Sequence, residues 1–199
     1  MKIFVDRKSV NYQFLQEIEN RNWVCGYCTT KVASDRGYKI GAHGDASGVQ
    51  VGGLYICPNC GAPTFFSPQS DVLPSPAFGN EVEHLPPEIE AVYNEARRCT
   101  SRDCHTAAVL VCRKILMNVA VNQGAKEGLR FAEYVNFLSD NGYIPPNGKH
   151  WVDHIRKKGN EATHEIALMK PEDAEEIIVF TEMLLRFVYE FPAKIPAPP

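Results

Sequence analysis

Four of the seven cysteines form two Cys-x-x-Cys pairs, which have the clearest chemistry in the sequence. The first pair is Cys25 and Cys28 in "CGYC", and the second is Cys57 and Cys60 in "CPNCG". A turn of this kind points both sulfurs to one side, so two turns supply the four soft ligands of tetrahedral zinc at ~2.3 Å. The pairs are 28 residues apart, more than the usual ~15–20, and a zinc ribbon with a long hairpin loop accommodates that separation. We therefore expect one Zn²⁺ ion at these cysteines.

The expected zinc is structural, because four thiolates leave no coordination position open for a substrate. Two redox dithiols are the alternative, but they would require a βαβ context that the surrounding sequence lacks. His43 is a further candidate ligand. Disulfides are not expected, because the cysteine count is odd and no export signal is evident.

A second polar set lies in "HIRKKGNEATHE", residues 154–165, where Arg156, Asn160 and His164 follow one another at steps of four. This spacing places them along one helix face. Histidine and arginine are the acid–base and cationic groups that cleavage of an RNA phosphodiester needs. Along one helix, however, Arg156 and His164 are separated by ~12 Å at a rise of ~1.5 Å per residue. Only two antiparallel copies in a dimer could bring them to one phosphate.

Gly159, in the middle of this stretch, favours a structural interpretation. Glycine costs ~1 kcal/mol relative to alanine inside a helix, and close approach of another helix, which we expect to be the central one, would compensate. Asn160 and His164 would then join helices by hydrogen bonds. The stretch is therefore a packing point, a ligand-binding or regulatory polar site, or a catalytic site.

Arg113 lies in the almost wholly apolar stretch "AAVLVCRKILMNVAV", so its charge needs a partner or an opening to solvent. Pairing with Asp153, Glu161 or Glu165 would make it part of an internal polar network. Alternatively, Arg113 could point into a cleft beside His164. His150 and His154 have the i, i+4 spacing of a metal-binding pair, but no third ligand is apparent.

The elements that position these residues fall into four segments. Residues 1–66 are expected to form the zinc-ribbon domain, with a strand-like "MKIFVD" and a helical turn or two in "FLQEIEN". Residues 67–86 read as a proline-rich linker, residues 87–192 as a helical bundle and residues 193–199 as a tail without regular structure. The predicted fold is mainly α with a small β zinc ribbon.

About five helices are predicted in the bundle. The second is apolar nearly all round, which makes it the central helix. Thr100 and Asp103 predict a capping box at its start, and Gly124 predicts its end. The last helix is predicted to begin at Pro171. Its apolar stripe consists of Ala174, Ile177, Ile178, Thr181, Leu184, Leu185 and Val188.

Composition is that of a soluble globular protein, with 44% hydrophobic and 23% charged residues. The longest apolar run, "AAVLVC", is far shorter than the ~20 residues of a membrane span. We expect a cytoplasmic protein without a membrane partner. Residues 1–66 hold 7 basic and 5 acidic residues, too small an excess for non-specific nucleic-acid binding. A local patch of Lys31, Arg36, Tyr38 and Lys39 is the candidate contact of the ribbon with nucleic acid or protein.

The segments "GLYICPNCGAPTFF", "AAVLVCRKIL", "IRKKGNEATHE" and "RFVYEFP" resemble the bacterial family labelled domain of unknown function 4145, and the resemblance covers about residues 55–191. The resemblance implies a helical domain of the HEPN superfamily, whose members occur in toxins, anti-phage systems and restriction-related proteins. Active HEPN ribonucleases usually carry Arg-Asn-x3-His and act as dimers with the motifs facing each other. Asn160 and His164 match this pattern, whereas Gly159 stands where the arginine would be.

The leading hypothesis is a zinc-containing binding or regulatory module that is nucleic-acid-associated and, by the resemblance alone, linked to phage defence. It is expected to form a homodimer through the helical domain. One alternative is a metal-independent HEPN-type ribonuclease, with Arg113, Arg156, Asn160 and His164 as candidate catalytic residues and Arg113 replacing the missing arginine. Another is a structural scaffold subunit, which would have an exposed apolar patch and no polar cleft.

Overall fold

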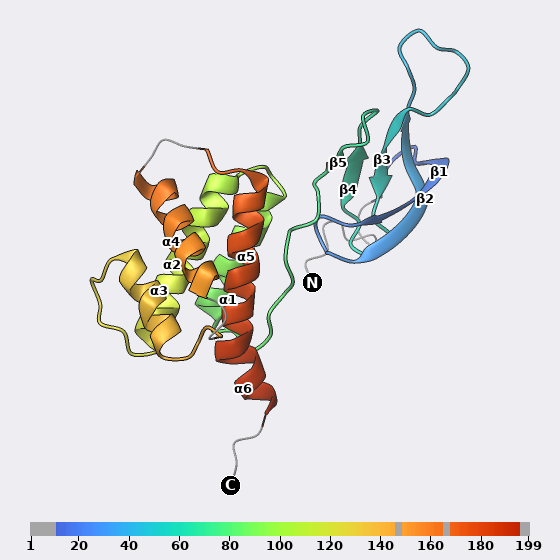
Figure 1. Cartoon of the computed structure of the whole chain (residues 1–199). Coiled ribbons are helices and arrows are strands. Elements are labelled where there is room, and N and C mark those ends of the chain that lie inside the picture. Colours follow the sequence, from blue (N-terminus) through green and yellow to red (C-terminus); the bar gives the residue numbers. More distant parts are fainter. Residues whose placement is uncertain (1–10, 146–148, 165–167, 196–199) are drawn as a thin grey trace. The chain divides into compact units, whose positions relative to one another are not determined.

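The computed structural model describes residues 11–145, 149–164 and 168–195, with the backbone alone for Lys149 and for residues 161–164. The chain divides into two compact units, Met1–Ala77 and Phe78–Pro199 (Figure 1). We call them the N-terminal unit and the helical unit. The predicted class is confirmed: the structure is mainly α-helical with a smaller β region.

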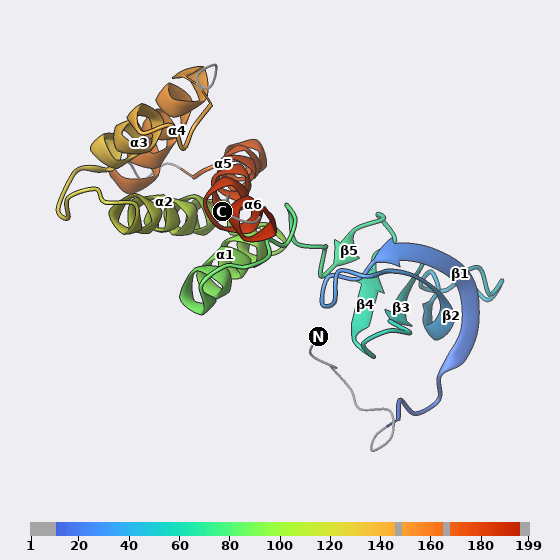
Figure 2. The same ribbon diagram turned by 90° about the horizontal axis from the view of Figure 1, so that it is seen from below.

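The N-terminal unit is an antiparallel five-stranded sheet in the order β1-β2-β3-β4-β5 (Figure 2). The strands are β1 (Gln16–Val24), β2 (Lys31–Ile40), β3 (Gly52–Ile56), β4 (Pro63–Phe66) and β5 (Val72–Leu73). Burial alternates along the start of β2, where Val32 and Ser34 are buried and Lys31 and Ala33 are exposed. This is the pattern of a sheet with one face against a core.

An aromatic trio fills the core of this unit. The rings of Trp23, Tyr55 and Phe66 meet edge to face, with centroid separations between 5.1 and 5.7 Å. Trp23 Nε1 donates a hydrogen bond to Thr64 Oγ1 at 3.2 Å, so the one polar atom of the indole is satisfied inside. Cys25, Cys57 and Cys60 belong to the same buried cluster.

The helical turn predicted in "FLQEIEN" is wrong, because Gln16–Val24 is strand β1. The pairing of β1 with β2 shifts register between Glu17 and Arg21. Such a bulge breaks the two-residue alternation by which a strand is recognised. The strand predicted in "MKIFVD" lies outside the described residues. Strand β5, which pairs Phe65 with Leu73 and Phe66 with Val72, lies within residues 67–86.

Within its described residues, the helical unit contains five main helices and a short C-terminal continuation. They are α1 (Pro87–Thr100), α2 (His105–Asn122), α3 (Phe131–Asp140), α4 (Lys149–His164), α5 (Pro171–Leu185), the π-helical turn η2 (Arg186–Glu190) and α6 (Phe191–Lys194). Helix α2 contacts α1, α3, α4 and α5 and is the central helix, as predicted. Gly124, at φ 101°, follows its end, and Pro171 begins α5, also as predicted. In the described part of the chain, no helix is both long and apolar enough to cross a membrane.

The capping box predicted from Thr100 and Asp103 is wrong. Thr100 is the last residue of α1, and its hydroxyl donates to the Arg97 carbonyl at 2.6 Å. Helix α2 begins at His105, after Cys104, without a side-chain cap. The chain between them makes a tight turn in which the Cys104 amide returns to the Cys99 carbonyl at 2.9 Å.

Helical structure continues further at the C-terminus than predicted. Side chains at steps of four form ion pairs along this segment: Glu182 with Arg186 at 3.0 Å, Arg186 with Glu190 at 2.8 Å and Glu190 with Lys194 at 2.8 Å. Such pairs stabilise a helix, and α6 reaches Lys194, inside the segment predicted to lack regular structure. The predicted stripe of α5 is buried from Ala174 to Leu185, and Val188 packs against it partly exposed.

Candidate functional site

The four cysteines of the two pairs come together in the N-terminal unit. Their sulfurs all lie within 4.8 Å of one another. The Cys25 and Cys60 sulfurs are 3.8 Å apart, as are those of Cys28 and Cys57. A tetrahedron of thiolates at ~2.3 Å from zinc has sulfur–sulfur edges of about 3.8 Å. The donor set therefore fits a tetrahedral metal ion, and among the described residues no other group of three or more potential ligands has this arrangement.

The two cysteine turns share one backbone conformation. In each, the first cysteine amide donates to a carbonyl five residues later, and its carbonyl accepts from the amide four residues later. The bonds are Cys25 N to Thr30 O (3.0 Å), Thr29 N to Cys25 O (2.8 Å), Cys57 N to Ala62 O (2.9 Å) and Gly61 N to Cys57 O (3.0 Å). Thr29 and Gly61 have positive φ at equivalent positions, 56° and 75°. The repeated turn explains why two short motifs present their sulfurs to one point.

The four thiols differ in their electrostatic surroundings. Burial raises the pKa of Cys28, but hydrogen bonds from Asn59 and Thr30 outweigh it and lower that pKa to about 6. Asn59 Nδ2 lies 3.4 Å from the Cys28 sulfur. Burial raises the pKa of the Cys25 and Cys60 thiols. A metal ion would therefore find the Cys28 thiolate ready at neutral pH and would displace protons from the Cys25 and Cys60 thiols.

Gly26, inside the first turn, is in close contact with the chain after β5. A Cβ atom at this position would lie 2.3 Å from the Pro74 carbonyl oxygen and 2.6 Å from that of Ser75. Any side chain would push this segment away from the cysteine turn. The sequence "CGYC" is therefore shaped by tertiary packing as well as by metal chemistry.

The other residues predicted to act in the ribbon have different surroundings. His43 is exposed in the loop between β2 and β3 and is not part of the four-sulfur group. The Tyr38 hydroxyl donates to the Gln13 carbonyl, and Lys39 Nζ donates to the Gly48 carbonyl. Lys31 and Arg36 are exposed. Two of the four polar groups of the predicted patch thus bond within the unit.

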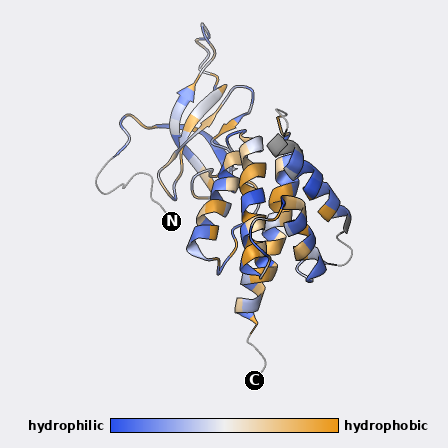
Figure 3. Ribbon diagram, turned by 90° about the vertical axis from the view of Figure 1, so that its left-hand side faces the viewer, coloured by the Kyte–Doolittle hydropathy of each residue, from blue (hydrophilic) through white to orange (hydrophobic). Residues whose placement is uncertain are grey.

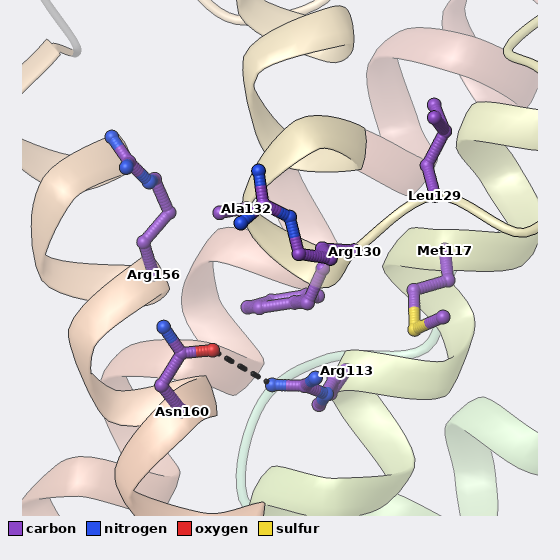
Figure 4. A pocket seen from close by; sticks show the side chains of 8 residues that line it. Arg113, Met117, Leu129, Arg130, Ala132, Arg156 and Asn160 are labelled. Carbon is purple, nitrogen blue, oxygen red and sulfur yellow. Dashed lines mark hydrogen bonds between the residues drawn. The ribbon is translucent and has the colours of Figure 1, made fainter.

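The helical unit has a pocket of about 510 Å³ between α2, the start of α3 and α4. Figure 4 shows three arginine side chains around it, one from each of these places. The lining residues are Arg113, Met117, Leu129, Arg130, Phe131, Ala132, Arg156 and Asn160. No carboxylate is among these lining residues, which come from the described part of the chain.

Arg113 connects α2 to the predicted motif on α4. Its Nη1 donates to the Gly159 carbonyl at 2.6 Å and lies 3.4 Å from Asn160 Oδ1 (Figure 4). Its guanidinium carbon lies 4.3 Å from the centre of the Phe131 ring, within the range of a cation–π contact. Desolvation lowers the pKa of Arg113. The Arg113 guanidinium is therefore held by the Gly159 carbonyl, the Asn160 side-chain oxygen and the Phe131 ring.

Of the three carboxylates expected to neutralise Arg113, only that of Asp153 lies within the described residues. Asp153 pairs with Arg156 on its own helix at 3.1 Å. The side chain of Glu161 and all of Glu165 lie outside the described residues. So does the side chain of His164, so its predicted place beside Arg113 stays a prediction.

Gly159 is a point of close approach, although its neighbour is not the predicted one. A Cβ atom here would lie 2.3 Å from Cε1 and 2.9 Å from Cδ1 of Phe131, at the start of α3. The central helix α2 contributes the hydrogen bond from Arg113 instead. Gly159 is thus packed against an aromatic ring.

Arg156 and Asn160 both face the pocket, as their shared helix face predicts. The Arg156 Nε atom is buried and has no hydrogen-bond partner among the described residues. The two histidines with metal-pair spacing have other contacts. His154 Nε2 pairs with Glu176 of α5, and the centroids of the His150 and Trp151 rings are 5.6 Å apart.

Sequence reasoning missed Arg130 and Phe131. Neither belongs to a recognisable motif, and the only local signal is that both stand in the first turn of the third predicted helix, "LRFAEYVNFLSDNG". Arg130 caps α3 together with Glu133, whose carboxylate accepts from the Arg130 amide at 2.8 Å. This cap holds Arg130 at the mouth of the pocket.

Comparison with known proteins gives one match. Residues 94–197, slightly more than half of the chain, match the family model described as "Domain of unknown function (DUF4145)". No curated protein and no solved structure matches the chain. The matched range contains the arginine-lined pocket and does not contain the four cysteines.

Proposed function

The chain belongs to the DUF4145 family, and we propose that it is a zinc-containing binding module without catalytic activity of its own. In this proposal one zinc ion, bound by Cys25, Cys28, Cys57 and Cys60, stabilises the N-terminal unit. The pocket between α2, α3 and α4 binds the ligand. The predicted HEPN-like character, nucleic-acid association and link to phage defence rest on the resemblance.

One observation carries the preference for binding over catalysis. Arg113 Nη1 donates to the Gly159 carbonyl and contacts Asn160, so motif groups hold α2 to α4. Gly159 is packed on Phe131, which leaves no room for an arginine side chain there. What remains accessible is a pocket lined by three arginines.

The proposed zinc ion is structural. Four thiolates would complete its coordination shell, so that the bound ion would cross-link the two cysteine turns. Such sites contribute roughly 10–16 kcal/mol of metal-binding energy to folding. The buried sulfurs and the 3.8 Å separations support this role.

An RNA cleavage assay tests the absence of catalysis. The purified, zinc-loaded full-length protein is expected to leave single-stranded and structured RNA intact. Cleavage that disappears in His164→Ala, with the circular dichroism spectrum of the wild type preserved, would overturn the proposal.

Ribonuclease activity is the second candidate, and the position of Arg113 favours it. An arginine from α2 within 3.4 Å of Asn160 Oδ1 could supply the cation that the motif lacks. This candidate requires His164 in the same site and a dimer with the two motifs facing each other. It predicts that Arg113→Lys and His164→Ala both abolish cleavage, whereas the first proposal predicts no cleavage to abolish.

We further propose that the predicted homodimer forms through α5 and its continuation. Apolar side chains at steps of four run along this segment; they are Val179, Met183, Phe187, Phe191 and Ile195. Val179, Phe187, Phe191 and Ile195 are between 45 and 68% exposed, and Figure 3 shows apolar residues along this segment. Exposed apolar stripes of this kind mark interaction surfaces. A two-fold axis would pair the stripe with itself.

The scaffold alternative and the cytoplasmic location stay predictions. The apolar stripe agrees with a scaffold subunit, whereas the arginine-lined pocket is a polar cleft that a pure scaffold would lack.

A further inference from the structure

We propose that the arginine-lined pocket binds a small phosphate ester of about mononucleotide size. This inference rests on the proposed binding function and names the ligand class of the same site. Its basis is the charge, the donors and the apolar wall of the pocket.

The charge of the pocket is concentrated, and the described carboxylates compensate it only weakly. Arg113, Arg130 and Arg156 come from three separate places in the chain and line one cavity. Arg130 pairs with Glu133 at 3.2 Å and Arg156 with Asp153 at 3.1 Å, and these carboxylate side chains are 41 and 76% exposed. Ion pairs open to solvent are weak and can be exchanged for a ligand.

Arg113 differs from the other two arginines, because its described partners are the Gly159 carbonyl, the Asn160 amide and the Phe131 ring. It therefore brings a charge into the site that no described carboxylate cancels. Guanidinium groups match the oxygen geometry of phosphate through paired N–H donors. Three of them suit a group that carries two negative charges better than a single carboxylate.

Hydrogen-bond donors without a described acceptor also favour an anionic ligand. Arg156 Nε is buried without a partner among the described residues. Phe131 and Ala132 are the first two residues of α3, a helix of 10 residues, and both line the pocket. Amides in the first turn have no acceptor within their own helix, and the helix dipole favours an anion there.

Apart from the arginines and Asn160, the described lining is apolar, and the pocket is larger than a phosphate alone would fill. Met117 and Leu129 form the side of the pocket opposite α4 (Figure 4). The cavity volume of about 510 Å³ lies within the ~300–1,000 Å³ of small-molecule sites. A phosphate at the arginines with a base or another flat apolar group against Met117 would occupy both parts.

The charge of the whole helical unit favours a small ligand over a long nucleic acid. Residues 78–199 hold 14 Lys and Arg against 18 Asp and Glu, a net charge of −4. A polyanion that extended beyond the pocket would therefore meet an acidic surface on average, without the basic tract that its backbone needs. The positive charge is local, as the ligand is inferred to be.

The test is isothermal titration calorimetry of the zinc-loaded full-length protein with AMP, inorganic pyrophosphate, citrate and adenosine. Arg130→Gln and Arg156→Gln are the informative variants, because Arg113 also holds α2 to α4. Arg98→Gln is the control: it removes the same charge from an exposed position on α1 outside the pocket. AMP and pyrophosphate are expected to bind, with affinity reduced about tenfold or more in each pocket variant, as for loss of a charge-assisted hydrogen bond. The Arg98→Gln control is expected to change the affinity by less than about twofold.

Four results would overturn the inference. The first is that neither AMP nor pyrophosphate gives a heat of binding at roughly 1 mM, a concentration that would reveal a dissociation constant as weak as about 1 mM. The second is an equal loss in Arg98→Gln and Arg156→Gln. The third is a 5′-phosphorylated RNA oligonucleotide that binds more tightly than AMP, which would assign the site to nucleic acid. Citrate binding that requires Arg156, without pyrophosphate binding, would refute the phosphate class and leave the binding module intact. Failure of the binding module itself would appear as RNA cleavage that depends on His164.

Discussion

The two units of this chain gain their stability in different ways. Among the described residues, the buried apolar cluster of the N-terminal unit contains nine residues, three of them cysteines, whereas that of the helical unit contains 26. A sheet with so small a core needs a cross-link, and the metal supplies it in our proposal. The helical unit has the larger apolar core, and Arg130 and Arg156 lie outside it in the lining of the pocket.

The difference also determines where functional residues can be found. In the N-terminal unit three of the four clustered cysteines are buried in the core, and in our proposal they serve the fold. In the helical unit the unusual chemistry lies in a pocket beside a well-packed core. We therefore regard the cysteines as structural and the arginines as functional, and the following predictions test that division from the largest expected effect to the smallest.

Loss of the metal should show the largest difference between the two units. Removal of the metal by a chelator, or Cys57→Ser, is expected to unfold the N-terminal unit, because it removes most of the roughly 10–16 kcal/mol of such a site. Trp23 is 7% exposed and Trp151 is 45% exposed, so tryptophan fluorescence should shift to the red through Trp23. Helical circular dichroism at 222 nm should persist. Metal analysis that finds well under one zinc ion per chain in the folded protein would refute the structural assignment.

Gly159→Ala tests packing in the helical unit. The added Cβ meets the Phe131 ring at 2.3 Å, and overpacking of this kind costs ~1–3 kcal/mol. Thermal unfolding should show a lower melting temperature, although alanine is the better helix former. In the Phe131→Leu background the cost of Gly159→Ala should shrink, since the smaller side chain can give way. Equal costs in both backgrounds would exclude this contact as the reason for glycine.

Phe187→Glu tests the proposed dimer surface. A charge in the middle of the apolar stripe should weaken self-association more than about tenfold, since burying an exposed aromatic side chain contributes ~1.5–3 kcal/mol. Sedimentation equilibrium measures the change, and the melting temperature of the helical unit should stay near that of the wild type. The matched control is Glu175→Gln on the same helix. A wild-type chain that is monomeric at all concentrations would remove the dimer proposal.

Acid should lower the stability of the helical unit in part by protonating Asp173. Burial raises the pKa of this carboxyl, but Lys158 at 2.7 Å and the Lys170 amide at 2.9 Å outweigh it and lower the pKa below its ordinary value. A lowered folded-state pKa contributes stability that is present above the unfolded value of ~3.9 and is lost as pH falls through the folded value. Asp173→Asn should therefore cost about 1 kcal/mol at neutral pH and flatten the loss of stability below about pH 4.

Urea unfolding between pH 3 and pH 7 measures this effect, and Glu172→Gln, at the exposed neighbouring position, is the control. An unchanged pH dependence in Asp173→Asn would show that the contact between α4 and α5 does not depend on this ion pair.

The sequence by itself determined the class of the fold, the position of the central helix, the start of α5 and the identity of the four clustered cysteines. These features depend on residues close together in the chain. Two Cys-x-x-Cys turns are each complete within a few residues, and helix periodicity and Pro171 are equally local. The family membership of the helical unit also follows from residues that stand in order along the chain.

The tertiary structure decided the pocket. Arg113, Arg130 and Arg156 meet because α2, α3 and α4 pack together, and no local pattern records such a meeting. Phe131 explains Gly159 only when the two helices are in place. The bulge in β1 likewise exists only through pairing with β2. Local patterns report the forces within one turn or strand, whereas a binding site is made by distant segments whose contact depends on how the whole core packs.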